Sequence, residues 1–321
     1  MIENIAIILL VFLGQVNVIS DVHEGPELLT QFIKTEFVKQ DVNYKKSNWD
    51  YYYDNLYLEN SLYSLPRKID SDANIDINSK SAIAFDVETD FILYSKNSEK
   101  KLPIASLTKI MTALIVLENN KLDEVITISE NAFKVKGKKE RLTIGEKISV
   151  ENLLKIMLMS SNNIAAVALA ERTSGNIDDF IDLMNKKAKL LGLRDTVFYN
   201  PTGLDQESDN ISTAYDIAQL VDYSLDKPLI WEYSKIQNII LSSLDGKINH
   251  KIKNTNLLLG KFENITGGKT GFTDKAGECL VLIINDANGK KNQIITVVLN
   301  AKDRFQETED LVNWVYKNYD W

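Results

Sequence analysis

Two residues three positions apart, Ser106 and Lys109, carry the chemistry that this sequence most clearly offers. They lie near the start of the stretch from Pro103 to Asn120, which after Ser106 is apolar apart from Lys109, two threonines and a polar end. A helix that is apolar on every side is buried inside a protein. We therefore predict a buried helix that begins after Pro103, with Ser106 at or near its start, where a hydroxyl is a good cap.

The position of Lys109 predicts a general base. A lysine one helical turn after Ser106 lies on the same face of the helix. Burial disfavours the charged amine and lowers its pKa, and a neutral amine beside a serine hydroxyl can activate that serine as a nucleophile. An isolated S-x-x-K pair is more often a helix cap followed by a solvated lysine. We expect this for Ser98 and Lys101, which have the same spacing in a polar turn.

Two further stretches offer groups that would complete a site. Residues 159–163 place four small polar residues at a break between two apolar helices, so they either form a surface loop or line a cleft. Residues 267–273 place Lys269 on a strand between glycines, which let a ligand approach the backbone closely. The positive charge of Lys269 suits a substrate carboxylate. A glycine-rich hairpin with a solvated lysine would have the same pattern.

The elements that must position these residues are predicted from hydrophobic periodicity. Residues 81–87 and 91–95 form a hairpin, and early strands separated from late strands by helices indicate one sheet with an insertion. The predicted fold class is α+β: a five-stranded antiparallel sheet flanked by helices, with an inserted all-helical lobe. Further strands are predicted at 236–242, 246–252, 265–270, 278–285 and 293–300, and helices at 146–172 with a break at 160–163, 177–191, 213–225 and 304–319.

Composition excludes several kinds of chemistry. A net charge of −8 and a pI near 5.1 argue against a nucleic-acid partner, because phosphate contacts need a basic surface. The single cysteine, Cys279, allows no internal disulfide and is predicted to be a buried small residue. The two histidines, His23 and His250, make a Ser–His–Asp triad or a His-rich zinc site hard to build. We therefore predict a lysine base, no metal and no cofactor.

The first 74 residues differ from the rest of the chain. Residues 5–14 form an apolar block that is short for a membrane span and suits the core of a signal peptide cleaved before Asp21. Glu3 stands where a signal peptide carries a basic residue, so an uncleaved anchor and a buried first strand stay open. Residues 21–74 are polar and rich in tyrosine. The predicted domains are a signal peptide or anchor at 1–20, an extension at 21–74 and a catalytic domain at 75–321.

The three site stretches, taken in their order along the chain, resemble the motif set of penicillin-binding proteins and serine β-lactamases. In detail the chain resembles the D-alanyl-D-alanine carboxypeptidase family, among the low-molecular-weight penicillin-binding proteins. The stretches that carry this resemblance lie between residues 75 and 321: S-A-I-A-F-D-V-E-T-D at Ser81, P-I-A-S-L-T-K-I-M-T-A at Pro103, S-N-N-I-A-A-V-A-L-A-E at Ser161, N-P-T-G-L-D at Asn200, S-T-A-Y-D at Ser212, N-T-N-L-L at Asn254 and G-G-K-T-G-F-T-D-K-A-G-E-C-L-V at Gly267.

The resemblance implies a role for each residue that matches the motifs. Ser106 would be the acylated nucleophile, Lys109 its base, and Ser161 the relay of a proton to the leaving amine. Asn163 would hold the substrate and orient Lys109. The terminal carboxylate would bind Lys269 and Thr270. The backbone N–H groups of Ser106 and Phe272 would form the oxyanion hole, and Gly271, which directly precedes Phe272, would be a substrate-binding residue.

The sequence offers two other placements of the middle motif. The register Ser160/Asn162 competes with Ser161/Asn163, and the distance to the apolar run after it favours the second. A literal S-D-N stands at residues 208–210, but it lies in a polar loop after a turn predicted at Asn200-Pro201-Thr202-Gly203, and no apolar helix follows it. The chain also departs from the usual family pattern, with Asp90 where glycine is common.

The resemblance implies a serine-type D-Ala-D-Ala carboxypeptidase that removes the terminal D-alanine from peptidoglycan stem pentapeptides through a Ser106 acyl-enzyme. β-Lactam antibiotics would be covalent inhibitors. We expect the protein to be exported to the cell wall or the outer face of the cytoplasmic membrane, with any membrane association through the N-terminus only. An endopeptidase or transpeptidase remains an alternative, as does a penicillin-sensing or peptidoglycan-binding module without turnover. A β-lactamase is disfavoured, because no E-x-x-x-N loop lies between Asn163 and Lys269.

Overall fold

The computed structural model describes residues 65–70, 72–135, 142–205, 207–285 and 292–321, and the backbone of two short strands near the N-terminus. The chain divides into two compact units, Met1–Ser61 and Leu62–Trp321. Within the first unit, β1 (Ile8–Phe12) pairs antiparallel with β2 (Gln15–Ile19). Apart from these strands, the predicted signal peptide or anchor and residues 21–64 of the predicted extension lie outside the described residues.

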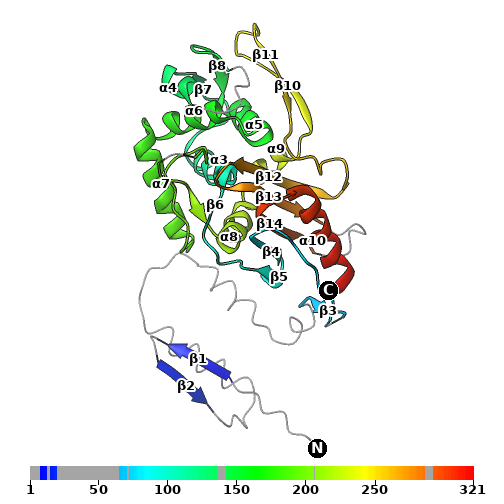
Figure 1. Cartoon of the computed structure of the whole chain (residues 1–321). Helices are drawn as coiled ribbons and strands as arrows, with labels where there is room; N and C mark the ends of the chain where they lie inside the picture. Colours follow the sequence, from blue (N-terminus) through cyan, green and yellow to red (C-terminus); the bar gives the residue numbers. More distant parts are fainter. Residues whose placement is uncertain are drawn as a thin grey trace, which may run out of the picture. The chain divides into compact units, whose positions relative to one another are not determined.

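A five-stranded antiparallel sheet forms the centre of the second unit (Figure 1). Two early strands join three late ones because β4 pairs with β14, which places Ile83 opposite Val297. The predicted hairpin, the sheet and the α+β fold class are therefore confirmed. In spatial order the strands are β12 (Ile265–Thr273), β13 (Gly277–Ile284), β14 (Ile294–Ala301), β4 (Ser81–Asp86) and β5 (Ile92–Lys96).

Both faces of this sheet are buried, and alternate residues of each central strand enter different cores. On β14, Ile295 and Val297 belong to the larger core, which includes the helical lobe and α8 (Ala214–Ser224). Ile294 and Val298 belong to a second core, which Leu311 of α10 (Arg304–Asn318) completes. Figure 1 shows α10, in red, on one side of the sheet and the lobe on the other. The sheet is thus held between two helical layers, which accounts for its apolar strands.

The lobe is built around α3 (Lys109–Asn119), whose first eight residues are all buried. The predicted break between two apolar helices is confirmed, because α5 ends and α6 begins on either side of Ser161, whose φ is +62°. The lobe is not all-helical, since short strand pairs of two to five residues also occur in it. Its other elements are β6 (Leu102–Pro103), η2 (Ala105–Thr108), β7 (Val125–Thr127), α4 (Glu130–Lys134), β8 (Lys147–Ser149), α5 (Val150–Ser160), α6 (Asn163–Ser174), α7 (Ile177–Leu190), β9 (Ile211–Ser212), α9 (Pro228–Ser234), β10 (Asn238–Ser242) and β11 (Asn249–Lys253).

The second unit begins before the predicted boundary at residue 75. A short strand, β3 (Arg67–Lys68), pairs with β15 (Tyr319–Asp320) at the end of the chain. The backbone N–H of Ile69 donates to Asn318 O at 2.8 Å, and the Lys68 ammonium lies 5.4 Å from the centre of the Trp314 ring. These contacts are between residues far apart in sequence, so local composition gave no sign of them. In the described part of the chain, no helix combines the length and the apolar character needed to cross a membrane.

Candidate active site

Ser106 lies in the 3₁₀ turn η2, between β6 and α3. The expected capping role was wrong, because the α-helix begins at Lys109 and neither η2 nor α3 has a side-chain cap. The preceding residue, Ala105, has a φ of +46°, a conformation that a residue with a Cβ adopts only under strain. A Cβ on Gly203 would stand 1.8 Å from Ala105 O, so only glycine allows the backbone to support this turn.

Lys109 has no exposed surface, and its Nζ contacts three oxygen atoms. These are Ser106 Oγ at 2.9 Å, Asn163 Oδ1 at 2.8 Å and the backbone O of Thr202 at 2.5 Å. Burial first, and then the nearby charge of Lys269, hold the pKa of Lys109 well below its ordinary value. A neutral amine has two N–H groups and one lone pair. Because the Asn163 and Thr202 oxygens only accept, they take both N–H groups and leave the lone pair for the Ser106 hydroxyl.

The Thr202 carbonyl is held by a turn that the sequence predicted at residues 200–203. Asn200 Oδ1 accepts hydrogen bonds from the backbone N–H groups of Thr202 and Gly203, at 3.0 and 2.7 Å. Asn210, the last residue of the rejected S-D-N, donates to Asn200 O and to Thr108 Oγ1, at 2.8 and 2.9 Å. Its side chain therefore braces this turn. Sequence reasoning missed the contact of Thr202 with Lys109, because a backbone carbonyl leaves no residue-type signal.

The structure distinguishes the two registers of the middle motif. The Ser160 hydroxyl donates back to Ile156 O within α5 at 2.8 Å, and Asn162 caps α6 by accepting from Ala165 N at 2.9 Å. Ser161, the next residue along, instead faces Lys269, whose Nζ donates to its Oγ at 2.9 Å. Since Asn163 contacts Lys109, Ser161 and Asn163 are the pair that the fold brings beside the two lysines.

Lys269 is 1% exposed, which contradicts the alternative of a solvated lysine in a glycine-rich hairpin. Its Nζ donates to Ser161 Oγ and, at 2.8 Å, to Thr270 O. Burial and then the positive charge of Arg304 lower the pKa of Lys269 to about 7. Arg304, which the sequence analysis did not single out, donates from Nη1 to Gly271 O at 2.8 Å and so lies beside the same strand.

The glycines of β12 make room for the protein itself, which corrects the expectation that they serve a ligand's approach. A Cβ on Gly267 would stand 2.7 Å from the Trp231 ring, and one on Gly268 would stand 2.8 Å from Val281 O. A Cβ on Gly271 would lie 3.1 Å from Ser106 N. The last contact matters for the site, because it sets β12 directly against the turn that carries Ser106.

Thr270 and Phe272 follow on the same strand. The hydroxyl of Thr270 lies 2.6 Å from that of Thr255, a second residue that the sequence analysis did not place in the site. Phe272 is 57% exposed, so an aromatic side chain stands at the surface next to Gly271. The six predicted side chains and the segment Gly271–Phe272 therefore come from η2, α3, the α5–α6 junction and β12, and they meet at one place.

Comparison with known proteins assigns the chain to a family. A profile described as D-alanyl-D-alanine carboxypeptidase matches residues 68–303.

The chain belongs to this family.

Two curated relatives of this chain are named for different activities. The D-alanyl-D-alanine carboxypeptidase DacF of Bacillus subtilis is 33% identical over 247 residues, which cover 75% of this chain and 63% of the relative. A D-alanyl-D-alanine endopeptidase of Pseudomonas aeruginosa is 36% identical over 244 residues, covering 75% of this chain and 78% of the relative. The match thus spans less than two thirds of DacF.

Solved structures agree with the family assignment. The crystal structure of the D-alanyl-D-alanine carboxypeptidase DacD from Francisella tularensis has a TM-score of 0.71 at 29% identity, covering 81% of this chain and 75% of that one. A peptidoglycan synthesis regulatory factor from Streptococcus pneumoniae has a TM-score of 0.69 at 30% identity, covering 75% of this chain and 74% of that one. Members of this family are serine hydrolases, which agrees with the Ser106–Lys109 geometry.

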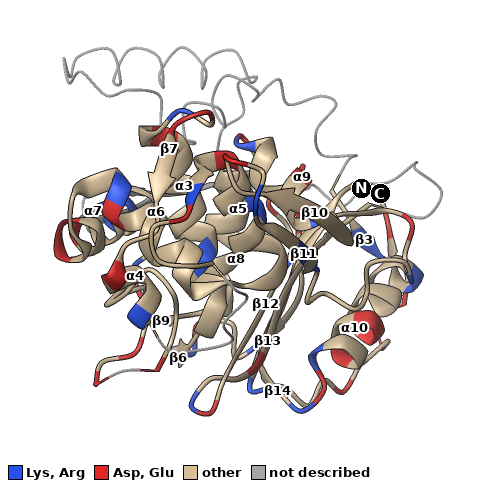
Figure 2. Cartoon of the chain, turned by 90° about the horizontal axis from the view of Figure 1, so that it is seen from above, with Lys and Arg blue, Asp and Glu red and all other residues tan. Residues whose placement is uncertain are grey.

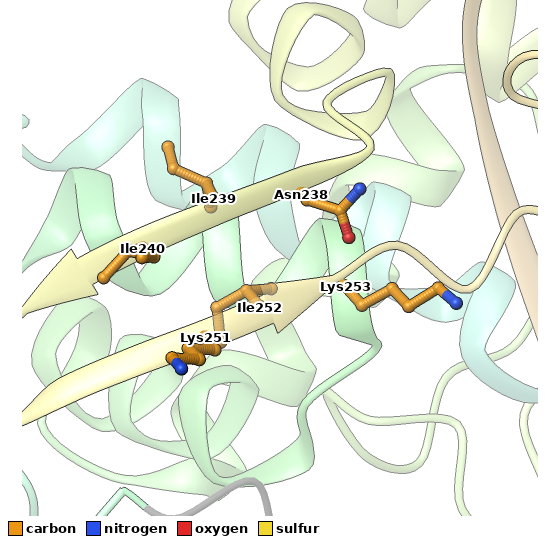
Figure 3. Close-up of a pocket in the computed structure, with 6 residues that line it drawn as sticks. All are labelled: Asn238, Ile239, Ile240, Lys251, Ile252 and Lys253. Atoms are coloured by element: carbon orange, nitrogen blue, oxygen red, sulfur yellow. The ribbon is translucent and has the colours of Figure 1, made fainter.

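The Cys279 and His250 side chains bond to residues outside this carboxypeptidase-family site, although the backbone of Cys279 lies opposite Gly271 in the sheet. Cys279 is buried, and burial raises the pKa of its thiol to about 11, as suits an unreactive core residue. His250 is also buried, with its Nε2 2.5 Å from Glu146 Oε1. Among the described residues, no group of three His, Cys, Asp or Glu side chains is arranged to hold a metal ion. A hollow on the β10–β11 hairpin contains none of the site residues and is lined by Asn238, Ile239, Ile240, Lys251, Ile252 and Lys253 (Figure 3).

Proposed function

We propose that this chain is a serine-type D-Ala-D-Ala carboxypeptidase that removes the terminal D-alanine from peptidoglycan stem pentapeptides. The observation that carries the proposal is the environment of Lys109, a buried amine with two acceptor-only partners and with Ser106 Oγ 2.9 Å from its Nζ. In the neutral form, an amine with these partners directs its lone pair to the hydroxyl. A hydroxyl paired in this way is an activated nucleophile, and it needs no histidine. Membership of the family supports the substrate class.

In the acylation step, Lys109 takes the Ser106 proton while Oγ attacks the carbonyl carbon of the penultimate D-alanine. The backbone N–H groups of Ser106 and Phe272 stabilise the negative oxygen that forms, and one such donor typically contributes ~3 kcal/mol. Ser161 passes a proton to the nitrogen of the leaving D-alanine. Water then hydrolyses the Ser106 ester, and Lys109 again acts as the base.

Lys269 and Thr270 bind the terminal carboxylate of the substrate in this proposal. A carboxylate beside Lys269 favours its ammonium form, so substrate binding raises the pKa of Lys269 from about 7. Arg304 adds a second positive charge at Gly271, and Asn163 holds both Lys109 and the substrate. Because β-lactams also carry a carboxylate next to a reactive carbonyl, they acylate Ser106 as covalent inhibitors.

A peptidoglycan substrate supports a location outside the cytoplasm, at the cell wall or on the outer face of the cytoplasmic membrane. The apolar block at residues 5–14 supports export by a signal peptide, or retention by an N-terminal anchor. The acidic net charge supports the absence of a nucleic-acid partner. Figure 2 shows basic and acidic residues scattered over the described helices and strands, with neither kind gathered on one side of the view.

The test is D-alanine release from a pentapeptide ending in D-Ala-D-Ala, with the full chain, Ser106→Ala and Ser160→Ala compared. Ser160 is the matched control, because its hydroxyl is bonded within α5. We expect release by the parent and by Ser160→Ala, and none by Ser106→Ala. Penicillin labelling of Ser106 without release would instead identify a sensor. Cleavage of cross-linked peptides alone would identify an endopeptidase, the activity named for the Pseudomonas aeruginosa relative.

A further inference from the structure

Thr255 connects the two substrate-facing motifs of the site. Its backbone N–H donates at 2.9 Å to the O of Met159, the residue two positions before Ser161. Its Oγ1 lies 2.6 Å from Thr270 Oγ1 and 3.3 Å from the same Met159 oxygen. Thr255 therefore spans the distance between the end of α5 and the middle of β12. Figure 2 shows β11, which leads into this segment, beside α5.

The backbone around Thr255 is fixed by the asparagines on either side of it. Asn254 donates from Nδ2 to Ser234 O and to Ile236 O, both at 2.8 Å, and its Oδ1 accepts from Asn256 N at 2.9 Å. Asn256 Oδ1 in turn accepts from Leu258 N at 3.0 Å. These bonds hold the segment against α9, so the Thr255 hydroxyl is presented to Thr270 in one place.

The hydrogen-bonding capacity of the two hydroxyls decides what this contact can do. Each threonine hydroxyl has one proton to donate and two lone pairs to accept. If Thr270 is to donate its proton to a substrate carboxylate, it cannot also donate that proton to Thr255. The short contact must then have Thr255 as donor, which leaves the Thr270 proton directed away from Thr255. Met159 O does not depend on the Thr255 hydroxyl, because it already accepts the Thr255 N–H.

We propose that Thr255 is a positioning residue, whose hydroxyl donates to Thr270 Oγ1 and so frees the Thr270 proton for the terminal carboxylate of the substrate. The inference rests on the proposed function, because it assigns the carboxylate to Lys269 and Thr270. It makes Thr255 act on substrate and β-lactam binding, and not on the proton transfers at Ser106.

The test compares Thr255→Val, Thr255→Ser and Thr266→Val in the full chain. Two quantities are measured. The first is acylation of Ser106 by benzylpenicillin, detected as an increase in the mass of the protein, and the second is D-alanine release from the pentapeptide. For Thr255→Val we expect the second-order acylation rate to fall about tenfold and KM to rise about tenfold, the size of one hydrogen bond to a charged group. The acylation rate at saturation and kcat stay within about twofold. Thr255→Ser keeps the hydroxyl and restores the parent values.

Thr266→Val is the matched control, because Thr266 lies on the same strand and its hydroxyl bonds Gln293 and Ile283 O instead. It should match the parent in both assays. A double variant with Thr270→Val extends the test. Once the Thr270 hydroxyl is absent, Thr255→Val should cause no further loss.

Three results would overturn the inference. The first is a Thr255→Val variant that equals the parent, and the second is a loss that falls on the saturated rate. The third is a Thr255→Ser variant that does not restore binding, with both variants melting at a lower temperature than the parent. A parent that is acylated but releases no D-alanine counts against the proposed carboxypeptidase activity, whereas the acylation rates still decide the role of Thr255. A parent that does neither overturns both proposals.

Discussion

Ser106–Lys109 and Ser98–Lys101 have the same residues at the same spacing, and the fold places them in opposite surroundings. The Lys101 side chain is 61% exposed and pairs with Asp195 at 2.7 Å, whereas Lys109 has no exposed surface. Loss of the surrounding water disfavours the ammonium form of Lys109 and drives it towards the neutral amine. The spacing brings a hydroxyl and an amine together, but burial decides which pair can act as nucleophile and base.

The partners of the two lysines differ as much as their exposure. Lys101 has a carboxylate partner, Asp195. Lys109 has the neutral oxygens of Ser106, Asn163 and Thr202, contributed by three separate segments. A carboxylate beside Lys109 would restore its charge and remove the base. The site therefore depends on what the fold keeps away from Lys109 as well as on what it supplies.

Replacing either lysine alone should give the largest difference in activity between the Ser106–Lys109 and Ser98–Lys101 pairs. We expect Lys109→Met to lower kcat/KM for D-alanine release by about 10²- to 10⁴-fold, the usual contribution of a general base. Lys101→Met loses only an exposed ion pair, so activity should stay within about twofold and the free energy of unfolding within ~1 kcal/mol. Equal losses in the two variants would show that burial does not distinguish them.

The turn that supports Ser106 can be tested with two glycines of similar φ. A Cβ on Gly203 (φ +78°) would stand 1.8 Å from Ala105 O, whereas a Cβ on Gly192 (φ +73°) would meet no atom within 4 Å. Both changes to alanine add backbone strain, but Gly203→Ala also forces η2 to move. We expect a loss of about 2–5 kcal/mol in urea unfolding for Gly203→Ala and of about 1–2 kcal/mol for Gly192→Ala. Similar losses would mean that the Gly203–Ala105 contact is not needed.

Burial of Lys269 should appear as a smaller, pH-dependent effect on stability. Its pKa is about 7 in the folded protein and near 10.4 in the unfolded chain, so between these values the unfolded state binds more protons. The contribution of Lys269 to the free energy of unfolding therefore rises as pH increases from about 7 to about 10. The difference between the parent and Lys269→Met, measured by urea unfolding at several pH values, should follow this rise.

Much of the architecture was predictable because its signals are local. The hairpin β4–β5, the three late strands and the helices α5 to α8 follow from periodicity within each segment. The S-x-x-K pair, the helix break near Ser161 and the turn at Asn200 were also found, because residue type and spacing decide them. Shorter strand pairs such as β6–β9, with two residues in each strand, are too short to show a hydrophobic alternation that would reveal them in the sequence.

The structure was needed wherever contacts between distant segments decide the outcome. Sequence placed residues 65–74 in the extension, but β3 needs β15, some 250 residues away, to form. The glycines of β12 were assigned to a ligand, but Trp231 and Ser106 N occupy the space beside two of them. Thr255 and the Thr202 carbonyl join the site through hydrogen bonds to residues far along the chain.

The sequence by itself determined which residue types lie within one helical turn or on the same strand. It therefore indicated the pairing of Ser106 with Lys109 and the glycines around Lys269. Only the tertiary structure decided that both lysines lose their water, that Ser161 and not Ser160 faces Lys269, and that neutral oxygens surround Lys109. The reason is physical: spacing along an element is a local property, whereas desolvation and hydrogen-bond geometry are sums over every segment that packs against a residue.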